Sequence, residues 1–154
     1  MSTHVQNIIN SCSQTLYALK TLRVHGLPNA TLKSIYRSVV VAKVMYAACA
    51  WSGFTNSRDR QHIDSFLHRG KRSGFCPIDI QDFAGLCYTA DVKLLKSVLV
   101  NCNHTLYPLL PDKSAASKYF NLRPLPHDTQ LPDFKYELTR NFFNRALFGL
   151  IHNF

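Results

Sequence analysis

A stripe of apolar residues, from Leu32 to Cys49, is the feature that most constrains the fold. Its members recur every three or four residues, so they keep one face of a helix apolar over about five turns, and we predict a helix that ends before a turn at 52–57. The stripe consists of Leu32, Ile35, Tyr36, Val39, Ala42, Met45, Tyr46 and Cys49. The apolar run within it, 39–51, is interrupted by Lys43 and is well short of the roughly 20 residues that span a bilayer. We therefore expect a core helix and no membrane partner.

A second helix follows a short turn at 52–57 and ends with residues 67–72. It offers few apolar residues, mainly Ile63, Phe66 and Leu67. Its polar surface is cationic, through Arg58, Arg60, Arg69, Lys71 and Arg72. The pattern indicates a helix that contacts the core on one side and presents charge on the other.

An amphipathic helix is expected upstream, over residues 4–24, because apolar residues again recur at intervals of three and four. Gly26 fits the left-handed position just past its end, and Pro28 prevents continuation. Asn29 or Thr31 is then expected to cap the apolar helix.

Downstream of Arg72 the pattern predicts a short helix beginning at Asp79 and another capped by Thr89. Five prolines between 107 and 134 exclude regular structure there, and a last helix is expected over 137–151. We predict an all-α bundle of about five or six helices. Its parts are a helical domain at 1–103, a Pro-rich irregular segment at 104–136 and a C-terminal docking helix at 137–154.

The net charge of +9 is concentrated in the first half of the chain. Residues 1–77 hold ten Lys or Arg and two Asp, a net +8, whereas residues 78–154 are nearly balanced. This asymmetry favours a polyanionic partner, nucleic acid before membrane. The alternative is a basic protein whose cations are simply solvated. The candidate nucleic-acid-binding residues are Arg58, Arg60, His62, His68, Arg69, Lys71 and Arg72.

Metal or catalytic chemistry is not indicated. The five cysteines form no CxxC pair, and Cys76, Cys87, Cys102 and His104 lack the spacing of a zinc site, so we expect reduced thiols, no metal and no cofactor. No metalloprotease, phosphate-loop, dinucleotide or hydrolase motif occurs, and we predict no catalytic residue and no small-molecule substrate. Asp59 and Asp64 are expected to form surface ion pairs. Tyr36, Tyr46 and Trp51 are expected in the core rather than stacked on bases.

Several short segments of the sequence, in their order and spacing, resemble the region downstream of the catalytic palm in non-LTR (LINE-type) reverse transcriptases. They are LYALKTLRVHGLP at 16–28, MYA at 45–47 with Trp51, DR at 59–60, RGKRSGF at 69–75, NHTLYPLLP at 103–111, YFNLRP at 119–124, His127, LP at 131–132 and NFFNRALF at 141–148. The resemblance covers nearly the whole chain. Leu125 departs from it, because related endings often carry a second Arg after the Arg-Pro pair, and this weakens any expectation of anion binding there.

The resemblance implies a thumb-like helical region that grips a template and primer duplex, DNA or RNA/DNA, through phosphate contacts without sequence preference. The family's palm aspartates, which bind two metals for polymerisation, have no counterpart here, so a noncatalytic, intracellular fragment is expected. Met1 is expected to start a truncated reading frame or an excised piece that once joined palm and fingers. Two alternatives are a helical protein interaction module, with the aromatic C-terminal tail as its docking element, and a decayed fragment without independent function.

Overall fold

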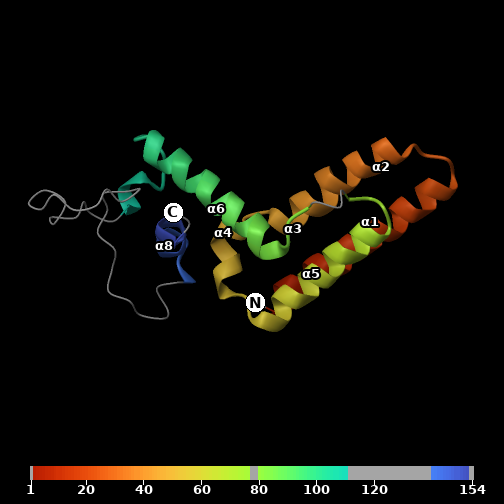
Figure 1. Cartoon of the computed structure of the whole chain (residues 1–154), viewed down its shortest axis with the longest axis horizontal. Helices are drawn as coiled ribbons and strands as arrows, with labels where there is room; N and C mark the ends of the chain where they lie inside the picture. Colours follow the sequence, from red (N-terminus) through yellow and green to blue (C-terminus); the bar gives the residue numbers. More distant parts are fainter. Residues whose placement is uncertain (1, 77–79, 111–139, 153–154) are drawn as a thin grey trace, which may run out of the picture. The chain divides into compact units, whose positions relative to one another are not determined.

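The computed structural model describes residues 2–76, 80–110 and 140–152, and these residues form helices and connecting turns without strands (Figure 1). The all-α fold expected from the sequence is confirmed. The chain divides into two compact units, residues 1–87 and 88–154. Most of the Pro-rich segment and residues 137–139 lie outside the described part, so the three-part division by sequence stays a prediction.

The first unit is built on two long helices that run parallel, α1 (Ser2–Val24) and α5 (Ser57–Arg72) (Figure 1). Their directions follow from one contact at each end. Near the start of both, the Ser2 hydroxyl donates to the Asp59 carboxylate at 3.3 Å, and near the end of both, Arg23 donates to the Ser73 carbonyl at 2.7 Å. The predicted stop of α1 is confirmed: Gly26 has φ +87°, and the Leu27 N–H bonds back to the Leu22 carbonyl at 3.1 Å.

The apolar segment that follows is a broken helix rather than the single one predicted. It comprises α2 (Asn29–Ile35), a π-helical segment (Tyr36–Val41), α3 (Ala42–Met45) and, after a break, α4 (Ala48–Trp51) with a 3-10 turn (Ser52–Phe54). The break occurs because Ala47 adopts a left-handed conformation, φ +51°. The Tyr46 carbonyl freed by the break accepts from the Trp51 indole N–H at 2.9 Å. The predicted side-chain cap at Asn29 or Thr31 is wrong, since Pro28 holds the N-cap position and no side chain caps the helix.

The buried face of this segment also differs from the predicted stripe. Its buried residues recur every four positions, because the wider π turn changes the helical phase. They are Leu32, Tyr36, Val40, Val44 and Ala48. Val39, Ala42 and Tyr46 are instead exposed, Tyr46 to 80%, which corrects its assignment to the core, whereas Tyr36 and Trp51 are buried as expected.

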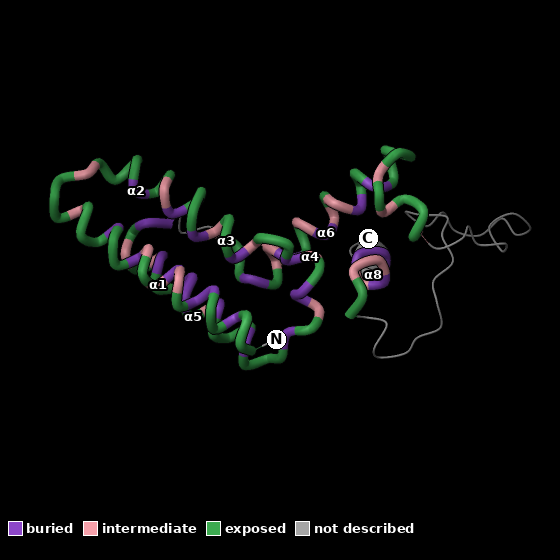
Figure 2. The backbone as a smooth tube through the Cα atoms, turned by 180° about the vertical axis from the view of Figure 1, so that it is seen from behind, coloured by how far each residue is buried: buried purple, intermediate pink, exposed green. Residues whose placement is uncertain are grey.

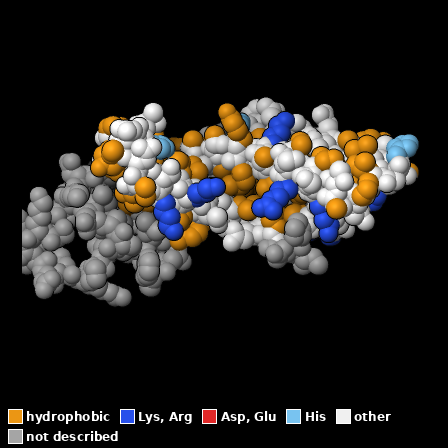
Figure 3. Space-filling model, turned by 90° about the horizontal axis from the view of Figure 1, so that it is seen from above, with side chains coloured by type: hydrophobic (Ala, Val, Ile, Leu, Met, Phe, Trp, Pro, Cys, Tyr) orange, Lys and Arg blue, Asp and Glu red, His pale blue; other side chains and the backbone are white. Residues whose placement is uncertain are grey.

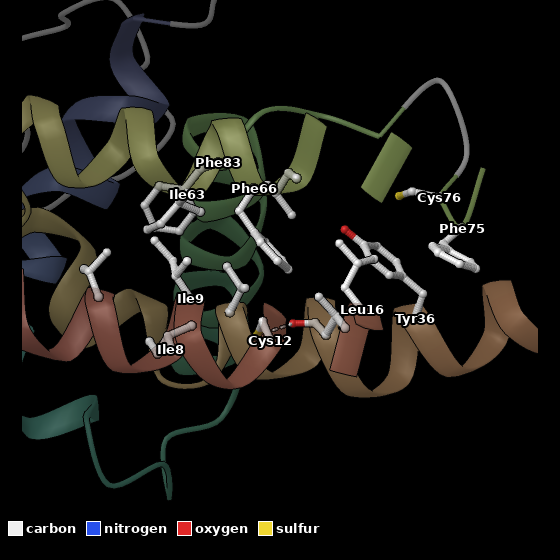
Figure 4. Close-up of a cluster of buried hydrophobic side chains, with 14 of the residues drawn as sticks. Ile8, Ile9, Cys12, Leu16, Tyr36, Ile63, Phe66, Phe75, Cys76 and Phe83 are labelled. Atoms are coloured by element: carbon white, nitrogen blue, oxygen red, sulfur yellow. Dashed lines mark hydrogen bonds between the residues drawn. The ribbon is translucent and has the colours of Figure 1, made fainter. Parts of the chain in front are cut away.

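The core of the first unit lies between the parallel helices and the broken one (Figures 2 and 4). Figure 4 shows Ile63 and Phe66 of α5 directed toward Ile9 and Cys12 of α1. The Cys12 thiol faces the Val40 carbonyl at 4.0 Å, and burial raises its pKa although nearby Lys43 opposes the shift.

Tyr36 crosses from the broken helix to α5, where its hydroxyl lies against Gly70. A Cβ added at Gly70 would lie 2.1 Å from Tyr36 Oη, so only glycine fits this position. The hydroxyl is buried, and no described residue hydrogen-bonds to it. Burial is the main cause that raises the pKa of Tyr36 well above its usual value.

Helix α6 (Phe83–Val100) begins in the first unit and continues into the second. Two shorter helices, with a boundary at Thr89, were predicted. Two carboxylates instead set one start: Asp64 accepts from the Phe83 N–H at 2.8 Å and Asp82 accepts from the Gly85 N–H at 2.9 Å. In the structure Thr89 therefore lies inside a continuous helix.

The second unit packs α6 against α8 (Phe142–His152) around Leu95, Ala146 and Leu147, with a 3-10 turn at Tyr107–Leu109. Asp91, 3% exposed, receives two hydrogen bonds from Arg145, at 2.7 and 3.2 Å. This bidentate ion pair fixes the C-terminal helix on α6. Among the helices of the described residues, none has both the length and the apolar character needed to cross a bilayer.

Candidate nucleic-acid interface

Both ends of α5, the helix that carries the predicted contacts, are defined by local hydrogen bonds. The Asn56 side chain caps its start by accepting from the Asp59 N–H at 2.7 Å. At its end, Gly74 has φ +72°, the Gly74 N–H donates to the Lys71 carbonyl and the Phe75 N–H donates to the Gly70 carbonyl. This is the Schellman arrangement, which stops the helix and turns Phe75 into the core. The helix is thus held at a fixed length.

The inner face of α5 contains all the apolar residues predicted for it, Ile63, Phe66 and Leu67, each at most 3% exposed. Gly70 and Asp59 lie on the same face. The inner face fixes the rotation of the helix, because burying Phe66 and Ile63 requires this orientation.

The two carboxylates of α5 are directed to structural partners, which corrects the predicted surface ion pairs. Asp59 is 5% exposed and accepts from Ser2, while Asp64 binds the first N–H of α6. Neither forms an ion pair with a described Lys or Arg. The capping and inter-helix roles could not be read from spacing, because the partners are 57 and 19 residues away.

The outer face of α5 brings together four of the predicted contacts, Arg58, His62, Arg69 and Arg72, all exposed. At 3.6 residues per turn they fall within about 80° of the helix circumference and extend over about 21 Å of its axis. The Arg69 guanidinium lies over the Phe66 ring at 5.5 Å, which restrains its stem. Asp59 is buried and Asp64 is half-buried with its carboxylate on the start of α6, so the four residues of the outer face are three cations and a histidine.

The remaining predicted contacts lie elsewhere on the helix. Arg60 Nε donates to Thr55 Oγ1 at 3.0 Å, and Lys71 Nζ donates to the Ile80 carbonyl at 2.6 Å, so both hold neighbouring turns. His68 is exposed and lies at the edge of the outer face, roughly 40° around the helix from Arg72. The structure therefore divides the predicted set into an outer face of four, with His68 at its edge, and two residues that hold neighbouring turns.

Other cations of the first unit were not singled out from the sequence. Arg23 lies over the Phe75 ring at 4.0 Å and donates to Ser73, so it closes the end of α5. Lys33 and Arg37 are exposed on α2 and the π segment. Their spacing of four residues would have placed them on one side of a helix, but the apolar stripe of the same helix obscured this pattern.

No group of three or more potential metal ligands occurs in the part of the chain that the structure describes. Cys76 and Cys87 are buried and Cys102 is exposed. A comparison with known protein families, with curated proteins and with solved structures finds no match to this chain.

Proposed function

We propose that the chain is a noncatalytic fragment of a LINE-type reverse transcriptase and binds duplex nucleic acid through phosphate contacts made by α5. The observation that carries the binding proposal is the outer face of α5, on which four cationic or donor side chains are exposed, while Asp59 is buried against Ser2 and the half-buried Asp64 binds the start of α6. A carboxylate on that face would repel the backbone of a duplex. The proposed family origin rests on the short sequence segments that resemble this family.

The dimensions of the face suit a nucleic-acid backbone. Phosphates of one B-DNA strand follow each other at 3.4 Å along the axis, so about 21 Å of helix passes roughly six of them. Guanidinium groups can bind phosphate oxygens in bidentate fashion. Such contacts position a duplex without reading its sequence.

The test is fluorescence anisotropy with labelled duplex DNA and an RNA/DNA hybrid over a salt series. The variant Arg58→Gln/Arg69→Gln/Arg72→Gln removes the cations of the outer face and leaves the structural Arg60 and Lys71 intact. Log K should depend on log salt with a slope of about −0.9 per contacted phosphate, so the triple variant should flatten the slope by roughly 2.7. Unrelated sequences should be affected equally.

The matched control is Lys20→Gln/Lys93→Gln/Lys96→Gln, which removes the same charge from exposed positions on α1 and α6. It should lower affinity less and leave most of the slope in place. Equal effects of the two triple variants would show that total charge, not the outer face of α5, determines binding.

A second candidate, protein interaction, is favoured by one specific observation. Tyr46 is 80% and Val39 45% exposed, and they line a groove of about 560 Å³ with Ile8, Ala42 and Lys43. Exposed aromatic residues in a groove are typical anchors of protein contacts. Tyr46→Ser should weaken a protein partner's binding and leave duplex affinity unchanged, which separates the two functions.

A further inference from the structure

A groove of about 520 Å³ lies in the first unit, on the side of the broken helix opposite to Tyr46. Half-buried aliphatic side chains from three segments line its interior, Val41, Ile80 and Leu86. The Tyr36 and Phe75 rings border it but are 1% and 0% exposed, so they offer almost no ring face. Its volume is that of small-molecule sites.

The rim of the groove is cationic. Lys33, Ser34 and Arg37 line it and are all exposed, with the two cations four residues apart. None of the described residues that line the groove is an Asp or Glu, and neither cation has an ion-pair partner among the described residues. Figure 3 views the molecule from above Figure 1, and shows Lys and Arg among hydrophobic side chains with no described acidic side chain visible.

We propose that this groove binds an aliphatic carboxylate, with the carboxylate between Lys33 and Arg37 and the hydrocarbon chain over Val41, Ile80 and Leu86. An acid suits the described part of the rim, which offers two cations and a hydroxyl donor and no carboxylate. A hydrocarbon is required because the interior is aliphatic. Nucleobases fit less well, since the covered rings of Tyr36 and Phe75 are not available for stacking.

The groove beside Tyr46 provides an internal comparison. It has a similar volume and an apolar lining, yet its one Lys, Lys43, donates a hydrogen bond to Ser11 Oγ. A ligand that merely seeks apolar surface near positive charge would use both grooves. A carboxylate that needs two unpaired cations would bind only in the groove at Lys33 and Arg37.

The probe is dodecanoate, titrated by calorimetry below its micelle concentration, with dodecyltrimethylammonium as the ligand of equal tail and opposite charge. We expect saturable 1:1 binding of dodecanoate and none of the ammonium compound. Lys33→Gln/Arg37→Gln should weaken dodecanoate binding about tenfold, the loss expected for two exposed ion pairs. Val41→Thr, which keeps side-chain volume, should weaken it by a smaller factor through the tail.

The matched control is Arg58→Gln/Arg69→Gln on α5, which should leave dodecanoate affinity unchanged. Equal loss in the two double variants, two equivalent sites, or no saturable binding would overturn the proposal. So would saturable binding of an acidic leucine-rich peptide where dodecanoate does not bind. The duplex measurements rest on Arg58, Arg69 and Arg72, so the proposal for α5 and the proposal for this groove can fail separately.

Discussion

Replacing Gly70 by alanine tests the close approach of Tyr36 to α5. An alanine Cβ would lie 2.1 Å from Oη, 2.5 Å from Cζ and 2.8 Å from Cε2 of Tyr36, all below the 3.0 Å that real Cβ atoms require. The ring cannot withdraw easily, because Tyr36 is 1% exposed and stacks on Phe75 with centroids 6.4 Å apart. The helix or the ring must therefore move.

Two opposing terms set the magnitude. Alanine is favoured over glycine inside a helix by about 1 kcal/mol. Overpacking a well-filled core costs about 1–3 kcal/mol, and a clash with three ring atoms places Gly70→Ala at the upper end. We expect a net loss of about 2 kcal/mol in the free energy of unfolding.

The assay is urea unfolding followed by far-UV circular dichroism and by fluorescence of Trp51, the one tryptophan of the chain. Trp51 stacks on Phe83 in the same unit, so its emission reports that unit. The matched control is Gly85→Ala in α6, whose added Cβ has side-chain atoms of Asp82 and Gln81 as its nearest neighbours, at 3.0–3.4 Å, and which should be close to neutral. Gly70→Ala/Tyr36→Leu should recover part of the loss, whereas Gly70→Ala/Tyr36→Phe should not, because Cζ remains. A Gly70→Ala protein as stable as wild type would refute the packing of Tyr36 on α5.

Tyr36→Phe removes a buried hydroxyl that lacks a described partner, so it should raise stability at neutral pH by about 1 kcal/mol in urea unfolding. Burial raises the pKa of Tyr36 above 10.0, its usual value, so above that pH the folded chain keeps a proton that the unfolded chain loses. The stability of the wild type should therefore fall as the pH rises above 10.0, and the stability of Tyr36→Phe should fall less between pH 9 and 11. Identical pH slopes of the two proteins would contradict the burial of the hydroxyl. Asp91→Ala removes the buried carboxylate that accepts two hydrogen bonds from Arg145 and should destabilise the docking of α8 by about 2–3 kcal/mol, seen as faster amide exchange at residues 142–147. Exchange unchanged from that of the exposed-site control Lys93→Ala would show that the pair does not hold α8.

The sequence predicted the helices that have a regular apolar period and a clear terminator. The stripe from Val5 to Leu19 and the glycine at 26 were sufficient to place α1, and the apolar residues of α5 are buried as expected. The predictions were wrong where the local structure depends on residues that are distant in the sequence. Asp64 fixes the start of α6 from another helix, and the left-handed Ala47 turns Tyr46 outward, although alanine gives no local signal for that conformation.

For the candidate site, composition and spacing identified the cationic helix, but they did not predict which side of the helix each charged residue occupies. Arg58, His62, Arg69 and Arg72 share a face, while Arg60 and Lys71 bond to Thr55 and Ile80. Thr55 and Ile80 belong to turns whose conformation depends on the packing of the whole first unit. The inward orientation of Asp59 likewise depends on α1.

The π-helical turn at Tyr36–Val41 also determines the geometry of the surfaces on either side of it. In a regular α-helix, residues four apart drift by about 40° per step, so a contact line from Leu32 to Val44 would wind by roughly 120°. The wide turn offsets part of this rotation, and the seam with the rest of the core stays nearly straight. Its two flanks are consequently straight as well: Lys33, Arg37 and Val41 line one groove, and Ser38, Ala42 and Tyr46 line the other. Deleting one residue from the π turn would restore the α-helical phase and wind both rows around the helix, so that neither groove could accept an extended ligand.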